Sequence, residues 1–368
     1  SPVGDPQAEP SATAALAPTA IADALLAKAM GELTAFDAKA KPADDEAPSP
    51  KPALPRRSDD AFDRNRFGRS TAEGRVLFEH ARNCFEDLAV MGAMRRPMPG
   101  VPWPAPLTEA RLLARIDALV ACGEEQFTNV LHLLEDRPVP DPELTWAAVF
   151  FCGSLAGDDA ADQAMRLARS APHDAPGMRA CLVDALALAP SSSLEPRLRR
   201  WTAEPNPSLR VLGFRALARR GVLVADEVRA ASVDVDPQVR TAAAFATSRT
   251  PDPPPLDALA RLLDETTNAA IVRAALVSSV YCAAPMGLGC ARALTRAGRG
   301  AFADASLFVA VMGGPDEFNT LLEDAASGGS PATVAALGWY GNLDATDYLV
   351  GRLRGANPAT KAAAALAT

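Results

Sequence analysis

The sequence predicts an all-α chain built as an α-solenoid of about eight stacked helix pairs, with an N-terminal helical cap and a Pro/Ala-rich tail. The first observation is a repeat of about 30 residues through the C-terminal two-thirds. The second is that capping residues open several repeats. The third is composition: hydrophobic residues make up 48% of the chain and aromatic residues 5%, and much of the apolar content is alanine. Such a core suits closely packed helices better than a sheet.

The repeat is seen best as a basic residue followed by small apolar residues, as in V-R-T-A-A at 239–243. A fixed period of this length is the signature of stacked helical units. The basic residue is absent at Trp146, Asp304 and Val334, which we interpret as degenerate copies. We expect the repeat arginines to pair with an Asp before the helix, as Asp236 with Arg240. The equivalent positions are 115, 146, 179, 210, 240, 273, 304, 334 and 361.

Several of the predicted first helices open with a polar residue and a proline. Proline at the first helical position lacks an N–H that would have no partner there, and the preceding Asn, Asp or Ser accepts a free donor. The agreement between the repeat and this capping chemistry strongly favours helix pairs. These openings are Asn206-Pro207, Asp236-Pro237, Ser330-Pro331 and Asn357-Pro358.

Three regions are predicted along the chain. Residues 1–58 form a Pro/Ala-rich tail with an amphipathic helix at 20–38, which fits either the first helix of the fold or a docking helix for a partner groove. Residues 59–106 form a helical cap and a Pro-rich connector. Residues 107–368 form the array of helix pairs, whose terminal unit needs a cap.

The repeat unit resembles the HEAT type, especially the short variety of phycobilisome-lyase-like proteins. The resemblance rests on D-P-Q-V-R-T-A-A at 236–243, with N-P-S-L-R at 206–210 as a partial copy, and it covers about 107–368. The arrangement also resembles an uncharacterised family of proteobacterial HEAT-like proteins, some of which are linked to type VI secretion. Such repeats imply scaffolds or adaptors, and also allow a chromophore lyase or chaperone, or a DNA-directed glycosylase.

The sequence offers no catalytic signature, cofactor motif or metal-ligand set. The segment 153–155, Gly-Ser-Leu, departs from the G-x-S-x-G pattern, and the Gly-Leu-Gly at 287–289 reads as a loop between paired helices. Six cysteines form no CxxC pair, and the three histidines lack metal-ligand spacing. We therefore expect a non-enzymatic protein with reduced thiols, in the bacterial cytoplasm.

The predicted partner is a protein, of unknown identity, and the sequence leaves the oligomeric state open. A net charge of −8 argues against general nucleic-acid binding, and no stretch is predicted to enter a membrane. Basic clusters on successive units would form a stripe that receives an acidic peptide, a phosphate or nucleic acid; the alternative is a solvated helix face. The candidate residues are Arg197, Arg200, Trp201, Arg219, Arg220, Arg292 and Arg296.

Overall fold

The computed structural model describes residues 72–95 and 105–355, apart from 136, 138, 252, 266–267, 298–301, 303 and 329. Every regular element in these ranges is a helix, which confirms the all-α class. The predicted tail at 1–58, its helix at 20–38 and the repeat copy at 361 lie outside the described residues.

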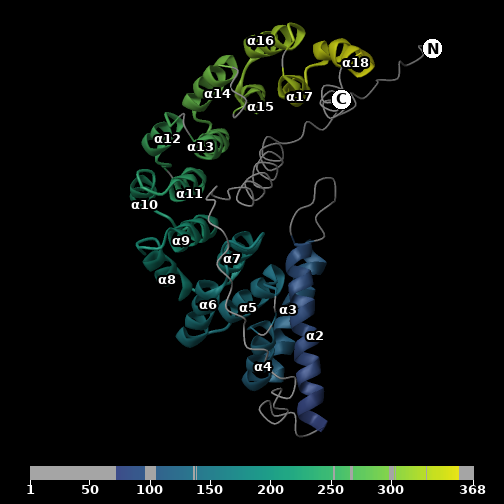
Figure 1. The fold of residues 1–368 in the computed structure, drawn as a ribbon, viewed down its shortest axis with the longest axis vertical. Helices are drawn as coiled ribbons and strands as arrows, with labels where there is room; N and C mark the ends of the chain where they lie inside the picture. The colour runs from purple at the N-terminus through teal and green to yellow at the C-terminus, as the bar shows by residue number, and fades with distance from the viewer. Residues whose placement is uncertain are drawn as a thin grey trace, which may run out of the picture.

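From residue 142 onward the helices form two rows along a curved array (Figure 1). Helices of the inner row lie on the concave side, and each packs against the next one in the row. The inner row consists of α5 (Pro142–Ser154), α7 (Met178–Leu188), α9 (Pro207–Arg220), α11 (Pro237–Thr247), α13 (Ala269–Tyr281), α15 (Ala305–Met312) and α17 (Pro331–Tyr340).

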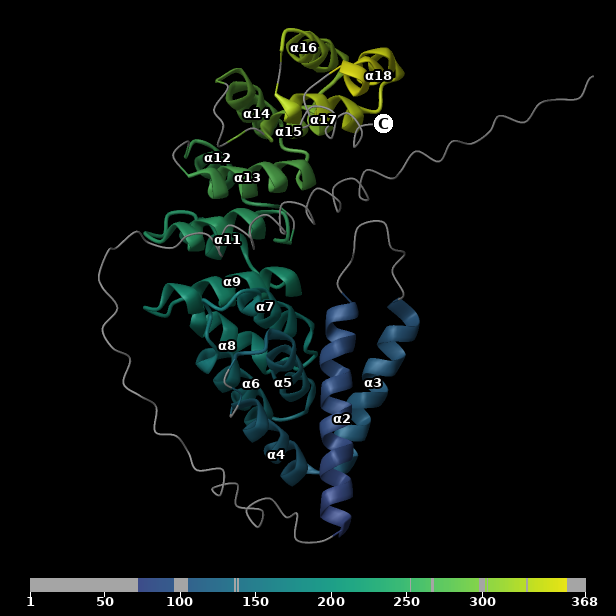
Figure 2. The same cartoon turned by 45° about the vertical axis from the view of Figure 1, so that its right-hand side comes forward.

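The outer row follows the convex side of the curve, and each of its helices comes directly after an inner-row helix in the chain (Figures 1 and 2). The outer row consists of α6 (Asp158–Ser170), α8 (Leu194–Trp201), α10 (Ala225–Ala231), α12 (Leu256–Leu263), α14 (Pro285–Ala297), α16 (Pro315–Ala326) and α18 (Thr346–Gly355), the last preceded by the 3-10 helix η3 (Leu343–Ala345).

The N-terminal helices depart from this two-row pattern. Helix α2 (Ala72–Met94) packs against α3 (Ala105–Cys122), α4 (Glu124–Glu135) and α5, so it lies between α3 and the inner row. Arg115 on α3 pairs with Asp87 on α2 at 3.0 Å rather than with the next repeat.

The predicted capping chemistry starts the inner-row helices α9, α11 and α17. The side chain of Asp236 accepts hydrogen bonds from the backbone N–H groups of Gln238 and Val239, and proline follows it at the first helical position. Asn206 and Ser330 cap α9 and α17 in the same way. Each cap satisfies donors that a helix start leaves without partners, so these boundaries are set locally by the sequence.

Inner-row helices are buried on several sides because they contact a helix on each side and the outer row behind. Trp146 on α5 is fully buried, as expected of a core residue at a degenerate repeat position, and its Nε1 donates to Asp184 at 2.9 Å. Gly92 on α2 lies so close to the Trp146 ring that a Cβ there would come within 2.4 Å of it. The buried side chains form two clusters that meet at α11.

Candidate functional site

The predicted basic residues do not form one stripe. Those of α8 and α14 lie in the outer row, and those of α9 lie in the inner row, so the two groups are on different sides of the array. The outer-row residues are Arg197, Arg200, Trp201, Arg292 and Arg296, and the inner-row residues are Arg219 and Arg220.

Arg197 links α8 to α6. Its guanidinium donates to Asp162 at 2.6 Å and to Asp158 at 3.0 Å, and its side chain is 12% exposed. The hydrogen bond from Arg197 lowers the pKa of Asp162 and, in return, raises the pKa of Arg197. Trp201 is buried, with Arg169 5.9 Å above its ring. These contacts hold neighbouring helices together. Of the three predicted site residues on α8, Arg197, Arg200 and Trp201, only Arg200 is exposed.

Arg220 and Arg292 also have structural roles. Arg220 donates to the carbonyl oxygens of Leu186, Ala189 and Ser191 at 2.7–2.9 Å, which satisfies the C-terminal end of α7. Burial lowers the pKa of Arg220. Arg292 pairs with Glu317 and so joins α14 to α16. Arg296 is exposed on α14.

Three of the repeat arginines, Arg210, Arg240 and Arg273, pair with carboxylates that precede the next inner-row helix. Arg240 donates to both carboxylate oxygens of Glu265, at 2.7 and 3.0 Å, and Arg273 pairs with Asp304 at 2.6 Å. The predicted pairing of Arg240 with Asp236 is wrong, because the Asp236 carboxylate is occupied by the first N–H groups of α11. Asp304 was predicted as a repeat position within a helix, and it is instead the N-cap residue of α15.

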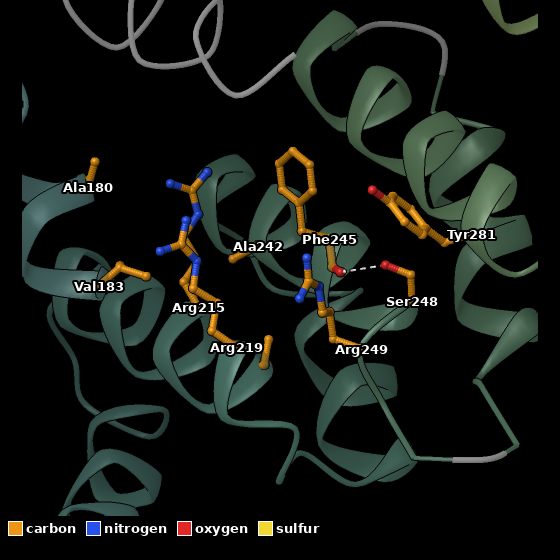
Figure 3. A pocket seen from close by; sticks show the side chains of 10 residues that line it. Ala180, Val183, Arg215, Arg219, Ala242, Phe245, Ser248, Arg249 and Tyr281 are labelled. Atoms are coloured by element: carbon orange, nitrogen blue, oxygen red, sulfur yellow. Dashed lines mark hydrogen bonds between the residues drawn. The ribbon is translucent and has the colours of Figure 1, made fainter. Parts of the chain in front are cut away.

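A pocket of about 80 Å³ opens on the inner row, between α7, α9, α11 and α13 (Figure 3). Arginine and aromatic side chains from different helices point into the same space. Of the predicted candidates, only Arg219 lies here. The lining residues are Ala180, Val183, Arg215, Ala218, Arg219, Ala242, Phe245, Ser248, Arg249 and Tyr281.

The three arginines of this inner-row pocket are held differently. Arg219 pairs with Asp184 at 2.9 Å, and the other oxygen of that carboxylate accepts from Trp146. The Arg215 guanidinium lies 5.7 Å from the centre of the Phe245 ring, within the range of a cation–π contact. Arg249 is exposed and has no ion pair with another described residue.

Charge is distributed unequally between the two rows. The helices α7, α9, α11 and α13 carry seven arginines and one acidic residue, Asp184, whereas α6, α8, α10 and α12 carry seven arginines and seven acidic residues. In a chain with a net charge of −8, these four inner-row helices are therefore basic, although Asp234, Glu265 and Asp304, which lie outside them, pair with three of their arginines. The seven inner-row arginines are Arg179, Arg210, Arg215, Arg219, Arg220, Arg240 and Arg273.

Sequence reasoning missed four residues of the pocket: Arg215, Phe245, Arg249 and Tyr281. The neighbouring arginines of α8 and α14 predicted a site there, but Arg197, Arg199 and Arg292 pair with carboxylates of other helices. The sequence signal that could have located the pocket is the summed charge of the first helices of successive units. Equivalent positions on stacked units form one surface.

No group of three or more His, Cys, Asp or Glu that could hold a metal ion occurs in the described part of the chain. The same residues include no helix long and apolar enough to cross a membrane. All six cysteines are free thiols, four of them buried, and burial raises the pKa of Cys152 to about 12.

Comparison with known proteins identifies no family. No protein-family model matches the sequence, and no curated protein matches it. Among solved structures, the chain is similar to an engineered protein determined by the Northeast Structural Genomics Consortium, at 14% sequence identity and a TM-score of 0.33, over 81% of this chain and 95% of that chain. A likeness this low carries no argument about fold or function.

Proposed function

We propose that this chain is an α-solenoid of HEAT-like helix pairs that acts as a non-enzymatic scaffold or adaptor, binding a protein partner through the inner row. The observation that carries the proposal is the inner-row pocket, where side chains from four successive units meet on the concave side. Extended concave surfaces of this kind are what repeat proteins use for binding.

The chemistry of this surface also supports protein binding. Arginine and aromatic residues are enriched where proteins contact one another and dominate the binding energy there. Phe245 and Tyr281 are half-buried and line the pocket together with the arginines. The outer-row arginines support the proposal less, because Arg197, Arg199 and Arg229 pair with carboxylates of neighbouring helices. The reducing cytoplasm is the proposed place of action, since all six thiols are free.

A capture experiment with a blocking variant tests the proposal. The tagged full chain serves as bait in a lysate of the native organism, beside Ala180→Trp, which fills the inner-row pocket from α7. Ala260→Trp is the matched control, because Ala260 is a half-buried alanine on the outer-row helix α12. We expect a stoichiometric protein partner with the wild type and the control but not with Ala180→Trp. Equal recovery by both variants, or only nucleic acid or pigment with the wild type, contradicts the proposal.

A further inference from the structure

We infer that the inner-row pocket binds an acidic peptide segment, which places a carboxylate among the three arginines and an apolar side chain against Phe245. The inference rests on the proposed function, since it names the chemistry of the partner at the same surface. Two features of the pocket support it: the three arginines Arg215, Arg219 and Arg249, and the apolar residues beside them.

The side chains that line the pocket give it a positive charge. Arg215, Arg219 and Arg249 line the pocket, and none of its other lining residues is acidic. Asp184, which lies outside the lining, pairs with Arg219, and Arg249 has no ion pair with another described residue. Because like charges repel, a carboxylate entering the pocket relieves this repulsion and gains charge-assisted hydrogen bonds.

Apolar residues beside the arginines would accept an apolar side chain of the peptide. Val183, Ala218 and Ala242 line the pocket and are buried, and Phe245 lines it with them. A cavity of roughly 150 Å³ takes a benzene molecule, so a space of about 80 Å³ accepts one aliphatic side chain or part of an aromatic ring. A bare phosphate would leave this apolar surface unused.

Nucleic acid fits this surface less well than an acidic peptide. Binding a polyphosphate backbone requires a line of unpaired basic groups along its path. On the inner row, Arg210, Arg240 and Arg273 are already paired with carboxylates at distances of 2.6–3.0 Å. Arg249, which has no ion pair with another described residue, lies at the pocket, and this arrangement suits one or two carboxylates better than a strand.

The outer groove next to Trp201 was the alternative site for an anion. It has a volume of about 270 Å³ and contains four arginines, but Asp162 and Glu204 line it too. Both carboxylates already pair with arginines of the groove, Asp162 with Arg197 and Glu204 with Arg169. An incoming anion would have to compete with them, so the inner-row pocket is the better site.

The test uses a random peptide library displayed on phage and selected on the immobilised full chain. We expect the enriched peptides to share acidic residues next to an aliphatic or aromatic residue. The most enriched peptide, synthesised with a fluorophore, is then titrated by fluorescence anisotropy. Arg249→Glu is expected to weaken its binding by about tenfold or more, which corresponds to about 1.4 kcal/mol. Arg249 has no ion pair with another described residue, so this variant breaks none of the described contacts.

Arg296→Glu is the matched control, because it makes the same charge change at an exposed position of the outer row. Its dissociation constant for the peptide should stay close to that of the wild type. Equal weakening by both variants would show a general charge effect and overturn the inference. Three other results would also overturn the inference: enriched peptides without acidic residues, no enrichment of any peptide, or a single-stranded oligonucleotide that competes with the labelled peptide equally well. In each of these cases a protein captured from lysate and lost in Ala180→Trp would leave the proposed function standing, so the two failures are distinguishable.

Discussion

The Arg210 guanidinium forms a two-point contact with the carboxylate of Asp234, at 3.0 and 2.9 Å, across 24 residues of chain. It also donates to the carbonyl oxygens of Glu204 and Pro205 at 3.0 and 2.9 Å. One side chain therefore joins the loop before its own helix to the loop before the next inner-row helix. Because such two-point, charge-assisted contacts are stronger than neutral hydrogen bonds, this contact contributes to the stacking of successive units.

Replacement of Asp234 should destabilise the fold. Asp234→Ala removes the partner of Arg210, whose side chain is only 14% exposed, and leaves that charge partly buried. We expect a loss of about 1–3 kcal/mol in the free energy of unfolding, measured by urea denaturation. Asp226→Ala is the control, because Asp226 is 91% exposed and its pair with Arg229 should contribute less than about 1 kcal/mol. Equal losses in the two variants would mean that the contact contributes little.

Two glycines of α14 should respond in opposite ways to alanine. A Cβ at Gly287 would lie 2.3 Å from the Cβ of Ser279 on α13, so Gly287→Ala should cost about 1–3 kcal/mol through overpacking. Gly289 has no atom within 4 Å of such a Cβ, and Gly289→Ala should stabilise by up to about 1 kcal/mol. Thermal denaturation of the two variants and the wild type measures both effects. A Gly287→Ala protein as stable as the wild type would contradict the close packing of α13 and α14.

The buried thiol of Cys152 should make stability depend on alkaline pH. Burial raises its pKa from 9.0 to about 12, so the folded protein keeps a proton that the unfolded chain loses above pH 9. Stability therefore falls as the pH rises from about 9 towards 12, and the loss at pH 10 is about 1.4 kcal/mol. Urea denaturation at pH 7 and pH 10 measures it. The Cys152→Ala variant should lack this part of the loss, and an equal loss in both proteins would refute the assignment.

Unfolding should proceed in two steps that divide at α11. The two core clusters meet there through alanines, with Ala243 and Ala246 in the first cluster and Ala244 in the second. Because alanine buries little area, we expect the coupling across this interface to be weaker than the coupling inside each cluster. Hydrogen exchange in rising urea should show α13–α17 opening before α5–α9. Simultaneous exchange of both segments would indicate one cooperative unit.

The helical fold could be predicted because its signals are local. Capping pairs such as Asp236-Pro237 and the roughly 30-residue period fix where helices begin, without reference to distant contacts. The placement of α2 could not be predicted from the period, since α2 carries no repeat pattern, and its position against Trp146 depends on the absence of a side chain at Gly92.

The candidate site was harder to predict from sequence because it depends on which arginines form ion pairs with carboxylates. Arg197 and Arg249 look equally available in the sequence, yet Arg197 contacts two carboxylates of α6 whereas Arg249 faces the inner-row pocket. Which arginines are neutralised is decided by residues 24 to 39 positions away. A sequence period predicts that two positions share a surface, but it does not reveal which charges are already satisfied.

Site-specific photo-crosslinking tests the central claim most directly. A benzophenone amino acid replaces Phe245 in the inner-row pocket, or Val233 next to the outer-row helix α10, where the side chain is 59% exposed. Both full-length proteins are irradiated in native lysate, and the crosslinked peptides are identified by mass spectrometry. We predict a crosslink from position 245 to an acidic segment of one partner protein, and none to that partner from position 233. A partner that crosslinks from position 233 and not from position 245 would contradict binding through the inner row.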